Sequence, residues 1–408
     1  MSKKLPQRAS VLAAALSLLA AAQVHAEQSP YYVGGALGLT QVSNLYRTAE
    51  GQPRNDDRVS TATLLAGLDQ RLGRQRLFGD ASLRNNRYAR NKTLDNNGYA
   101  LNAGLDWETA NRLAGQLSLN ANRNLAQFNP GGGAPSVTKK NIEQTQQARA
   151  SVRYGLLSRL TLEASLTHRK REYSASEYDG YDFSQDTVAL GLIYRQSAAL
   201  SLGVSLRHTE GYYTNIPFGG GFLRDDFKGD DLDFTVDWRP SGASSLNARL
   251  STSRRDRSLV SSRDFSGLTG ALSWRWQPTA KLQINTSLSR DTGDESSFQN
   301  LGNLGSVNSD FSRVTNSLQI NSSYELSGKL LLDAGLAYSD RSLSNRLGLR
   351  ESSGAEKTSS VNLGLRWLFS RAGLLGCQIN YDQRRADLVV SLPYDADSYG
   401  CYVQLTLR

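Results

Sequence analysis

Apolar and polar side chains alternate along almost the whole chain with a period of two. In the segment 98–107, Leu101, Ala103, Leu105 and Trp107 share one side, and most residues between them are glycine, asparagine or aspartate. This alternation predicts β-strands with one apolar and one polar face, because successive side chains in a strand point to opposite sides. Only 39% of the 408 residues are hydrophobic, which is little for a water-soluble sandwich of this length. A transmembrane β-barrel fits better, because lipid covers the apolar face and water the polar one.

The alternation breaks at intervals that predict eighteen antiparallel strands joined up and down into one barrel. We expect them near 32–44, 58–72, 76–88, 97–108, 112–128, 142–155, 159–173, 184–195, 199–213, 229–239, 244–258, 265–277, 280–290, 312–326, 329–343, 357–369, 373–386 and 398–408. Short connections alternate with long ones, as in outer-membrane barrels, whose short turns are periplasmic. The even number puts both termini on the periplasmic side, where the first and last strands can pair.

The long connections lie at 45–57, 129–141, 214–228, 291–311, 344–356 and 387–397. A barrel of eighteen strands is wide enough for an aqueous channel unless loops fold into it. We expect 291–311 and 214–228 to constrict it. Phe218, Phe222 and Phe227 in the second of these loops either stack on sugar rings or pack within the loop.

The amino terminus has the features of a secretory signal peptide. Two lysines and an arginine come first, a short apolar run covers 11–24, and Ala26 ends a small-residue cleavage site. The expected organisation is a signal peptide at 1–26 and a transmembrane barrel at 27–408. An exported chain of amphipathic strands with no long apolar segment points to the outer membrane of a Gram-negative cell.

Aromatic residues precede the short connections on the apolar side of their strands. Rings with a polar edge favour the membrane–water interface, so we interpret these residues as a periplasmic girdle. They are Trp107, Tyr154, Tyr194, Trp238, Trp276, Tyr324 and Trp367.

The polar faces carry many charges that the alternation places in the lumen. The arginines are Arg84, Arg149, Arg153, Arg169, Arg171, Arg207, Arg249, Arg275, Arg366 and Arg384. The acids include Asp80, Glu163, Asp233, Asp333 and Asp382. Two interpretations remain open: the arginines attract an anionic solute, or they pair with carboxylates and support the wall. The formal charge of +9 and its arginine bias also suit contacts with lipopolysaccharide.

Little in the sequence indicates catalysis. His168 and His208 share the apolar parity of their strands and should point outward, away from any Ser–His–carboxylate arrangement in the lumen. No Cys/His spacing suits a metal, and the glycine run 131–133 lacks the Lys-Ser/Thr of a phosphate loop. We therefore expect no enzyme activity, no metal, no cofactor and no nucleic-acid partner.

The two cysteines, Cys377 and Cys401, lie on the last two strands with outward parity. A hairpin centred near residue 389 would set them opposite each other, which predicts a disulfide in an oxidising compartment. The alternative is two free thiols that face lipid as small apolar groups.

The segment 67–128 resembles a known family. It contains Gly73-Arg74-Gln75-Arg76-Leu77-Phe78, Arg84-Asn85-Asn86-Arg87-Tyr88, Leu94-Asp95-Asn96-Asn97-Gly98-Tyr99, Gly104-Leu105-Asp106-Trp107 and Leu113-Ala114-Gly115-Gln116-Leu117. These resemble EpsL-type outer-membrane proteins encoded with exopolysaccharide biosynthesis clusters. The resemblance implies a barrel that passes a polysaccharide across the outer membrane, together with a periplasmic polysaccharide export protein and an inner-membrane polymerase or copolymerase.

Two functions therefore follow as expectations. The first is a channel for exopolysaccharide secretion, in contact with lipid, lipopolysaccharide and its polymer. The second is a general or substrate-specific porin for small anionic or sugar solutes.

Overall fold

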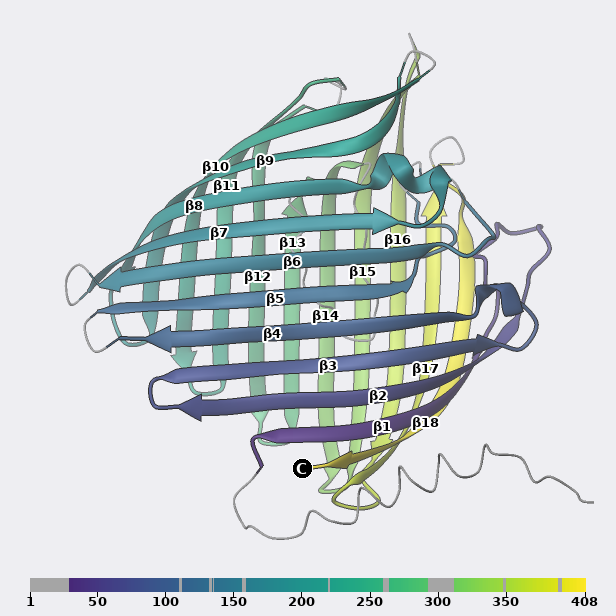
Figure 1. Cartoon of the computed structure of the whole chain (residues 1–408), viewed down its shortest axis with the longest axis horizontal. Helices are drawn as coiled ribbons and strands as arrows, with labels where there is room; N and C mark the ends of the chain where they lie inside the picture. The colour runs from purple at the N-terminus through teal and green to yellow at the C-terminus, as the bar shows by residue number, and fades with distance from the viewer. Residues whose placement is uncertain are drawn as a thin grey trace, which may run out of the picture.

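The chain folds into one closed antiparallel sheet (Figure 1). The computed structural model describes residues 29–109, 112–131, 134, 136–155, 159–218, 221–259, 264–292, 312–347, 350–387 and 391–408. Within them the sheet has 18 strands, and β1 pairs with β18 from Val33–Leu407 to Val42–Ser398, so that no edge is left free. The predicted eighteen-stranded barrel is confirmed. The predicted signal peptide lies outside the described residues.

The strands follow one another around the barrel in sequence order. They are β1 (Tyr31–Val42), β2 (Asp57–Leu72), β3 (Gln75–Tyr88), β4 (Asn96–Glu108), β5 (Leu113–Leu125), β6 (Ile142–Gly155), β7 (Leu160–Tyr173), β8 (Phe183–Arg195), β9 (Leu200–Phe218), β10 (Gly221–Ser241), β11 (Ser244–Arg257), β12 (Phe265–Thr279), β13 (Leu282–Asp291), β14 (Ser312–Ser327), β15 (Leu330–Leu347), β16 (Arg350–Trp367), β17 (Gly373–Ala386) and β18 (Tyr394–Leu407).

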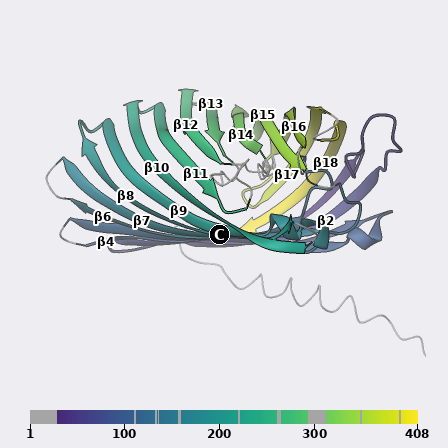
Figure 2. The ribbon, with the colours of Figure 1, turned by 90° about the horizontal axis from the view of Figure 1, so that it is seen from above.

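The strands are tilted relative to the barrel axis. In Figure 1 the near wall, β1 to β8, runs across the view, whereas the far wall, β13 to β17, runs up it. In Figure 2 the strands between these walls, such as β10 and β11, curve from one wall to the other. Opposite walls cross in this way because a closed sheet must stagger its hydrogen-bond register.

Two predicted loops are largely strand, which corrects the sequence analysis. Most of 214–228 belongs to the β9–β10 hairpin, in which Asp225 pairs with Tyr213. Most of 344–356 belongs to the β15–β16 hairpin. The hydrophobic pattern ends there because the outward positions become charged, as at Asp226 and Lys228, although the alternation of exposed and buried residues continues.

The outward face of the barrel is apolar over a broad band. Among its side chains, Leu37 is 70% exposed and Leu64 66%, and Leu206 and Val188 are similarly open. No soluble core covers these groups, so the wall is stable only where lipid or another apolar phase surrounds it.

The buried apolar packing lies at the end with the long connections. One cluster joins Leu45, Leu94 and Phe128 from three connections, and a second joins Val137, Ala175 and Tyr178. The long connections thus pack on one another, which gives this end of the barrel a core of its own.

Two short 3-10 helices lie in these connections, η2 (Lys92–Leu94) and η3 (Ser176–Tyr181). Among the described residues, no helix is long and apolar enough to cross a membrane.

Candidate functional site: a charged lumen crossed by a loop

A network of buried charges covers the inner face of β9, β10 and β11. Arg207 donates two hydrogen bonds to Asp233, at 2.9 and 3.1 Å, and its Nη1 lies 3.2 Å from Asp231. Arg255 forms a bidentate pair with Asp231 at 3.1 and 2.9 Å, and Arg249 lies 3.4 Å from Asp233. Antiparallel register explains the network, because paired residues and their neighbours two positions away share the inner face.

A second network lies on β15, β16 and β17. Glu356 accepts a hydrogen bond from Arg341 at 3.0 Å, and the Nε of Arg384 lies 3.6 Å from the same oxygen. All three side chains are almost fully buried. Charges so far from water are stable only when they are paired, so this group fixes the local geometry of the wall.

The β5–β6 connection reaches this second network. Asn129 accepts a hydrogen bond from Arg384 at 2.9 Å and donates to the carbonyl oxygens of Arg47 and Leu392. Gly131 packs so closely on Glu356 that a Cβ there would overlap the carboxylate. Its φ of +80° also lies in the left-handed region that favours glycine.

This contact takes the loop across the barrel. Around the sheet, β1 to β4 and β18 lie between β5 and β17. A loop that leaves β5 therefore passes five other strands before it reaches Arg384 on β17. The described part of the β5–β6 connection thus reaches inward-facing residues of β16 and β17, whereas most of 214–228, which was predicted to constrict the lumen, is strand. The other predicted constriction, 291–311, lies almost wholly outside the described residues.

Further along the lumen, exposed arginine–carboxylate pairs follow the wall. Arg76 donates to Asp69 at 2.8 and 2.7 Å, and Arg366 to Asp333 at 2.5 and 2.7 Å. Arg149 is 3.9 Å from Glu163, and Asp382 is held by Ser360 and, at 3.1 Å, by Arg47. These charges largely neutralise one another.

Three lumen arginines lack a carboxylate partner among the described residues. Arg84 donates to the side-chain oxygen of Asn124 at 2.7 Å, and Arg275 to that of Gln283 at 3.2 Å. Arg153 faces Glu163 in the register but forms no ion pair with it. The carboxylate of Asp80 accepts from the neutral Asn102. Of the lumen charges named here, three arginines and one aspartate therefore form no ion pair with a described residue.

Two more arginines lie against aromatic rings. The guanidinium carbons of Arg169 and Arg171 lie 5.3 and 4.6 Å from the ring centroid of Phe183. Arg171 also donates to the carbonyl oxygen of Tyr181 at 3.0 Å. Phe227 is buried with Tyr213 and Phe183, whereas Phe222 is 71% exposed at the end of its hairpin; the Phe218 side chain lies outside the described residues.

The structure places all the lumen residues named from the sequence on the inner face. It also adds members that were missed. Asp231 has the parity of Asp233, and Arg255 and Arg257 have that of Arg249, so the same two-residue rule applied to the strand ends would have found them. No signal in the sequence links Arg341, Glu356 and Arg384 to Asn129, because that contact joins distant connections.

The predicted girdle residues lie near the short connections. Six of the seven are more than a third exposed, and Trp107 is half-buried against Gly115. Trp274 stacks on Trp276 with centroids 5.3 Å apart, and Tyr31 and Phe369 are also exposed at this end. Cys377 and Cys401 pair in register on β17 and β18 and are joined by a disulfide.

Both histidines lie outside the lumen, on the outward face near the long connections. His168 Nδ1 is 2.8 Å from Asp186, and His208 Nδ1 is 2.6 Å from Asp230. In the part of the chain that the structure describes, no hydroxyl or thiol is hydrogen-bonded to either imidazole. Over the same residues, no group of three or more His, Cys, Asp or Glu side chains is placed to hold a metal.

The pKa of one loop carboxylate, Asp182, is raised. Burial beside η3 raises the pKa of Asp182 to about 6, and the negative charges of Asp179 and Glu172 act in the same direction. The backbone N–H of Tyr173, which donates to Asp182 at 2.7 Å, offsets part of the rise. Asp182 therefore changes its charge in the mildly acidic range.

The whole barrel has counterparts among solved structures. OccK2 (OpdF) of Pseudomonas aeruginosa superimposes with a TM-score of 0.51 at 13% identity, over 93% of this chain and all of that one. The outer membrane protein OpdK of the same organism gives 0.46 at 14% identity, over 92% and 98%. No family model matches the chain. No curated protein matches it in sequence. The likeness to OccK2 shows that the two chains share a fold.

Proposed function

We propose that the protein is an outer-membrane channel for small anionic solutes. The observation that carries this proposal is the lumen, in which Arg84, Arg153 and Arg275 form no ion pair with any carboxylate that the structure describes. Arg84 and Arg275 are hydrogen-bonded to the neutral side chains of Asn124 and Gln283, so they keep a positive potential that suits a carboxylate or phosphate in transit. Binding of this kind is weak and repeated, which is what conduction requires.

The membrane placement rests on the outer wall. Its apolar band ends in exposed aromatic rings beside the short connections, an arrangement that anchors barrels at a lipid interface. On this basis we put the short connections and both termini in the periplasm and the long connections outside the cell, in contact with lipopolysaccharide.

A small solute suits the lumen better than a polymer. The β5–β6 connection is held against the inner side of β17 by the hydrogen bond between Arg384 and Asn129. A polysaccharide chain would need the β5–β6 connection to be displaced throughout transport. Exopolysaccharide secretion, with its periplasmic and inner-membrane partners, stays a prediction from the resemblance alone.

Ion selectivity tests the proposal directly. The purified protein is inserted into a planar bilayer, and the zero-current potential is measured across a potassium chloride gradient. We expect a potential of the sign that marks chloride as the more permeant ion, whereas a cation preference would contradict the proposal. A clean deletion strain, with extracellular and periplasmic polysaccharide measured beside the parent, tests the polymer function separately.

A further inference from the structure

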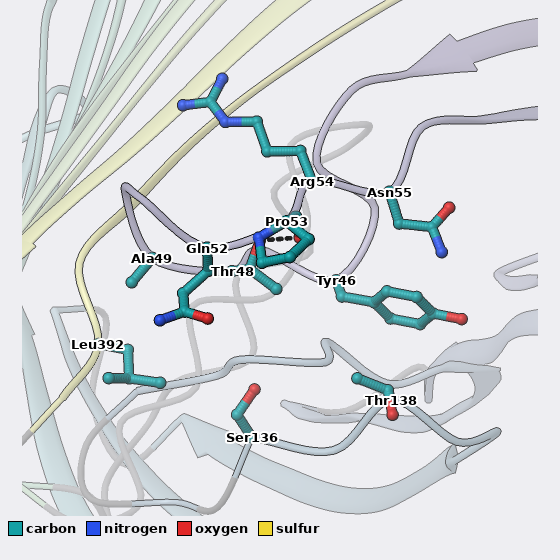
Figure 3. A pocket seen from close by; sticks show the side chains of 10 residues that line it. All are labelled: Tyr46, Thr48, Ala49, Gln52, Pro53, Arg54, Asn55, Ser136, Thr138 and Leu392. Atoms are coloured by element: carbon teal, nitrogen blue, oxygen red, sulfur yellow. Dashed lines mark hydrogen bonds between the residues drawn. The ribbon is translucent and has the colours of Figure 1, made fainter.

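A cavity of 560 Å³ opens between three of the long connections, apart from the charged lumen wall (Figure 3). The β1–β2 connection contributes most of its lining, the β5–β6 connection supplies Ser136 and Thr138, and the β17–β18 connection supplies Leu392. Its volume is within the range of about 300–1,000 Å³ that is usual for small-molecule sites.

Apart from Arg54, the polar side chains of this cavity are uncharged, and some of their hydrogen-bonding groups are unused. The side chains of Gln52 and Thr138 form no hydrogen bond with any other residue that the structure describes. Ser136 uses its hydroxyl hydrogen on the carbonyl of Phe128, at 3.1 Å, which leaves its oxygen free to accept. An amide and two hydroxyls at one cavity can both donate to and accept from a ligand rich in hydroxyl groups.

The single cation in the lining is neutralised. Nη2 of Arg54 lies 2.9 Å from both carboxylate oxygens of Asp395. An anion would therefore have to compete with a carboxylate that is already in place. The cavity differs in this respect from the lumen, where three arginines form no ion pair with a carboxylate in the described part of the chain.

Apolar surface completes the lining. Tyr46 is fixed by its hydroxyl, which donates to Asn91 at 3.0 Å, and by an edge contact with Phe128 at a centroid distance of 4.8 Å. Pro53 and Leu392 lie at the same cavity (Figure 3). Sugars combine apolar C–H faces with a rim of hydroxyls, so a fixed ring among neutral donors and acceptors matches both parts of their surface.

We propose that this cavity is a binding site for an uncharged sugar at the outer mouth of the barrel. The ligand is either a free mono- or oligosaccharide or a unit within a longer glycan, since the same hydroxyl chemistry serves both. The proposal does not depend on the channel function, because it concerns loops that lie outside the charged lumen wall.

Binding is measured on the whole protein in a detergent without a sugar head group, by saturation-transfer difference NMR. The probes are maltose, maltoheptaose and glucuronate. We expect saturable millimolar binding of maltose that the double variant Gln52→Ala/Thr138→Val weakens at least about tenfold, which corresponds to about 1.4 kcal/mol. Gln196→Ala, an exposed glutamine in a short connection, is the matched control and should bind as the parent does.

Each outcome decides a part of the proposal. Equal binding of maltose and maltoheptaose supports a free sugar, and a clear preference for maltoheptaose supports a glycan chain. The absence of saturable maltose binding would overturn the site, as would binding that the double variant leaves unchanged. Tighter, variant-sensitive binding of glucuronate would overturn the neutral character of the ligand. Loss of anion selectivity in the bilayer experiment would leave these results untouched, so the two proposals fail separately.

Discussion

Arg384 on β17 donates a hydrogen bond to Asn129 in the β5–β6 connection, at 2.9 Å, and so fixes a loop from one wall of the barrel to the other. This bond is buried, and the same asparagine also holds the backbone of two further connections. Loss of this bond should therefore change the conductance of the barrel.

Asn129→Ala should release the β5–β6 connection from β17. The variant leaves three hydrogen-bonding groups without their partner, at a cost of about 1–3 kcal/mol each where they stay buried. We expect a larger and noisier single-channel conductance in a planar bilayer. Arg385→Gln, an exposed position next to Arg384, is the control and should conduct like the parent. Equal conductance in the parent and both variants would show that the β5–β6 connection does not limit the flow of ions.

Gly131→Ala tests the same contact through backbone and packing. Alanine in the left-handed region costs about 1–2 kcal/mol, and its Cβ would also overlap the carboxylate of Glu356. Gly51→Ala is a close control, because Gly51 has a φ of +82° but open space around its Cβ. We expect raised conductance only for Gly131→Ala, and a similar rise in both variants would assign the effect to the backbone alone.

Arg84→Gln and Arg275→Gln should each lower the preference for chloride, because each removes a lumen charge that no described carboxylate neutralises. The zero-current potential in a salt gradient measures the change. Arg76→Gln is an informative comparison: Arg76 is paired with Asp69, so its loss frees a carboxylate and should shift selectivity further toward cations. An unchanged potential in all three variants would contradict a role for lumen charge.

The disulfide should stabilise the seam of the barrel. Cys377 and Cys401 enclose a loop with a sequence separation of 24, for which chain entropy suggests about 3 kcal/mol. We expect reduction, or the double change to alanine, to lower the temperature at which the folded band is lost on a denaturing gel. An unchanged transition would mean that backbone pairing alone sets the stability of this hairpin.

The region around η3 should loosen as the pH rises. Asp182 has a pKa of about 6 in the folded protein, above the ordinary value of 3.8, so the folded state favours its neutral form. Its stabilising contribution is full below about pH 4 and is lost as the pH rises through 6. Hydrogen exchange at the Tyr173 amide should therefore show less protection at pH 7 than at pH 5, beyond the intrinsic pH dependence of exchange. Asp182→Asn should remove this difference, and its persistence would assign the effect to another group.

The sequence predicted the barrel wall well, because a two-residue period is decided locally. The positions of Leu101, Leu105 and Trp107 in the sequence are enough to assign them to one face of their strand, and no distant residue is needed. The same rule set Arg207, Asp233 and Arg249 on the inner face. It failed in 214–228, where charged outward residues such as Lys228 replaced apolar ones while the pairing continued.

The contacts between connections could not be predicted in this way. Asn129 meets Arg384 across 255 positions of sequence, and nothing in the residues near either one indicates the partner. The cavity beside Tyr46 likewise needs three connections to be in place at once. Such contacts depend on the conformations of the connections, and the two-residue periodicity of the strands carries no information about these.

The pairing of β1 with β18 also determines the order in which the molecule can assemble. Every other neighbouring pair among the described strands joins elements that are consecutive in the sequence, so each can form as a local hairpin with a small loop-closure cost. The seam is different, because Val33 and Leu407 stand at opposite ends of the chain and meet only when all the strands between them have curved into place. Ring closure therefore depends on all the preceding hairpins, and we expect a chain that lacks its last strand to accumulate as an open sheet with two exposed edges.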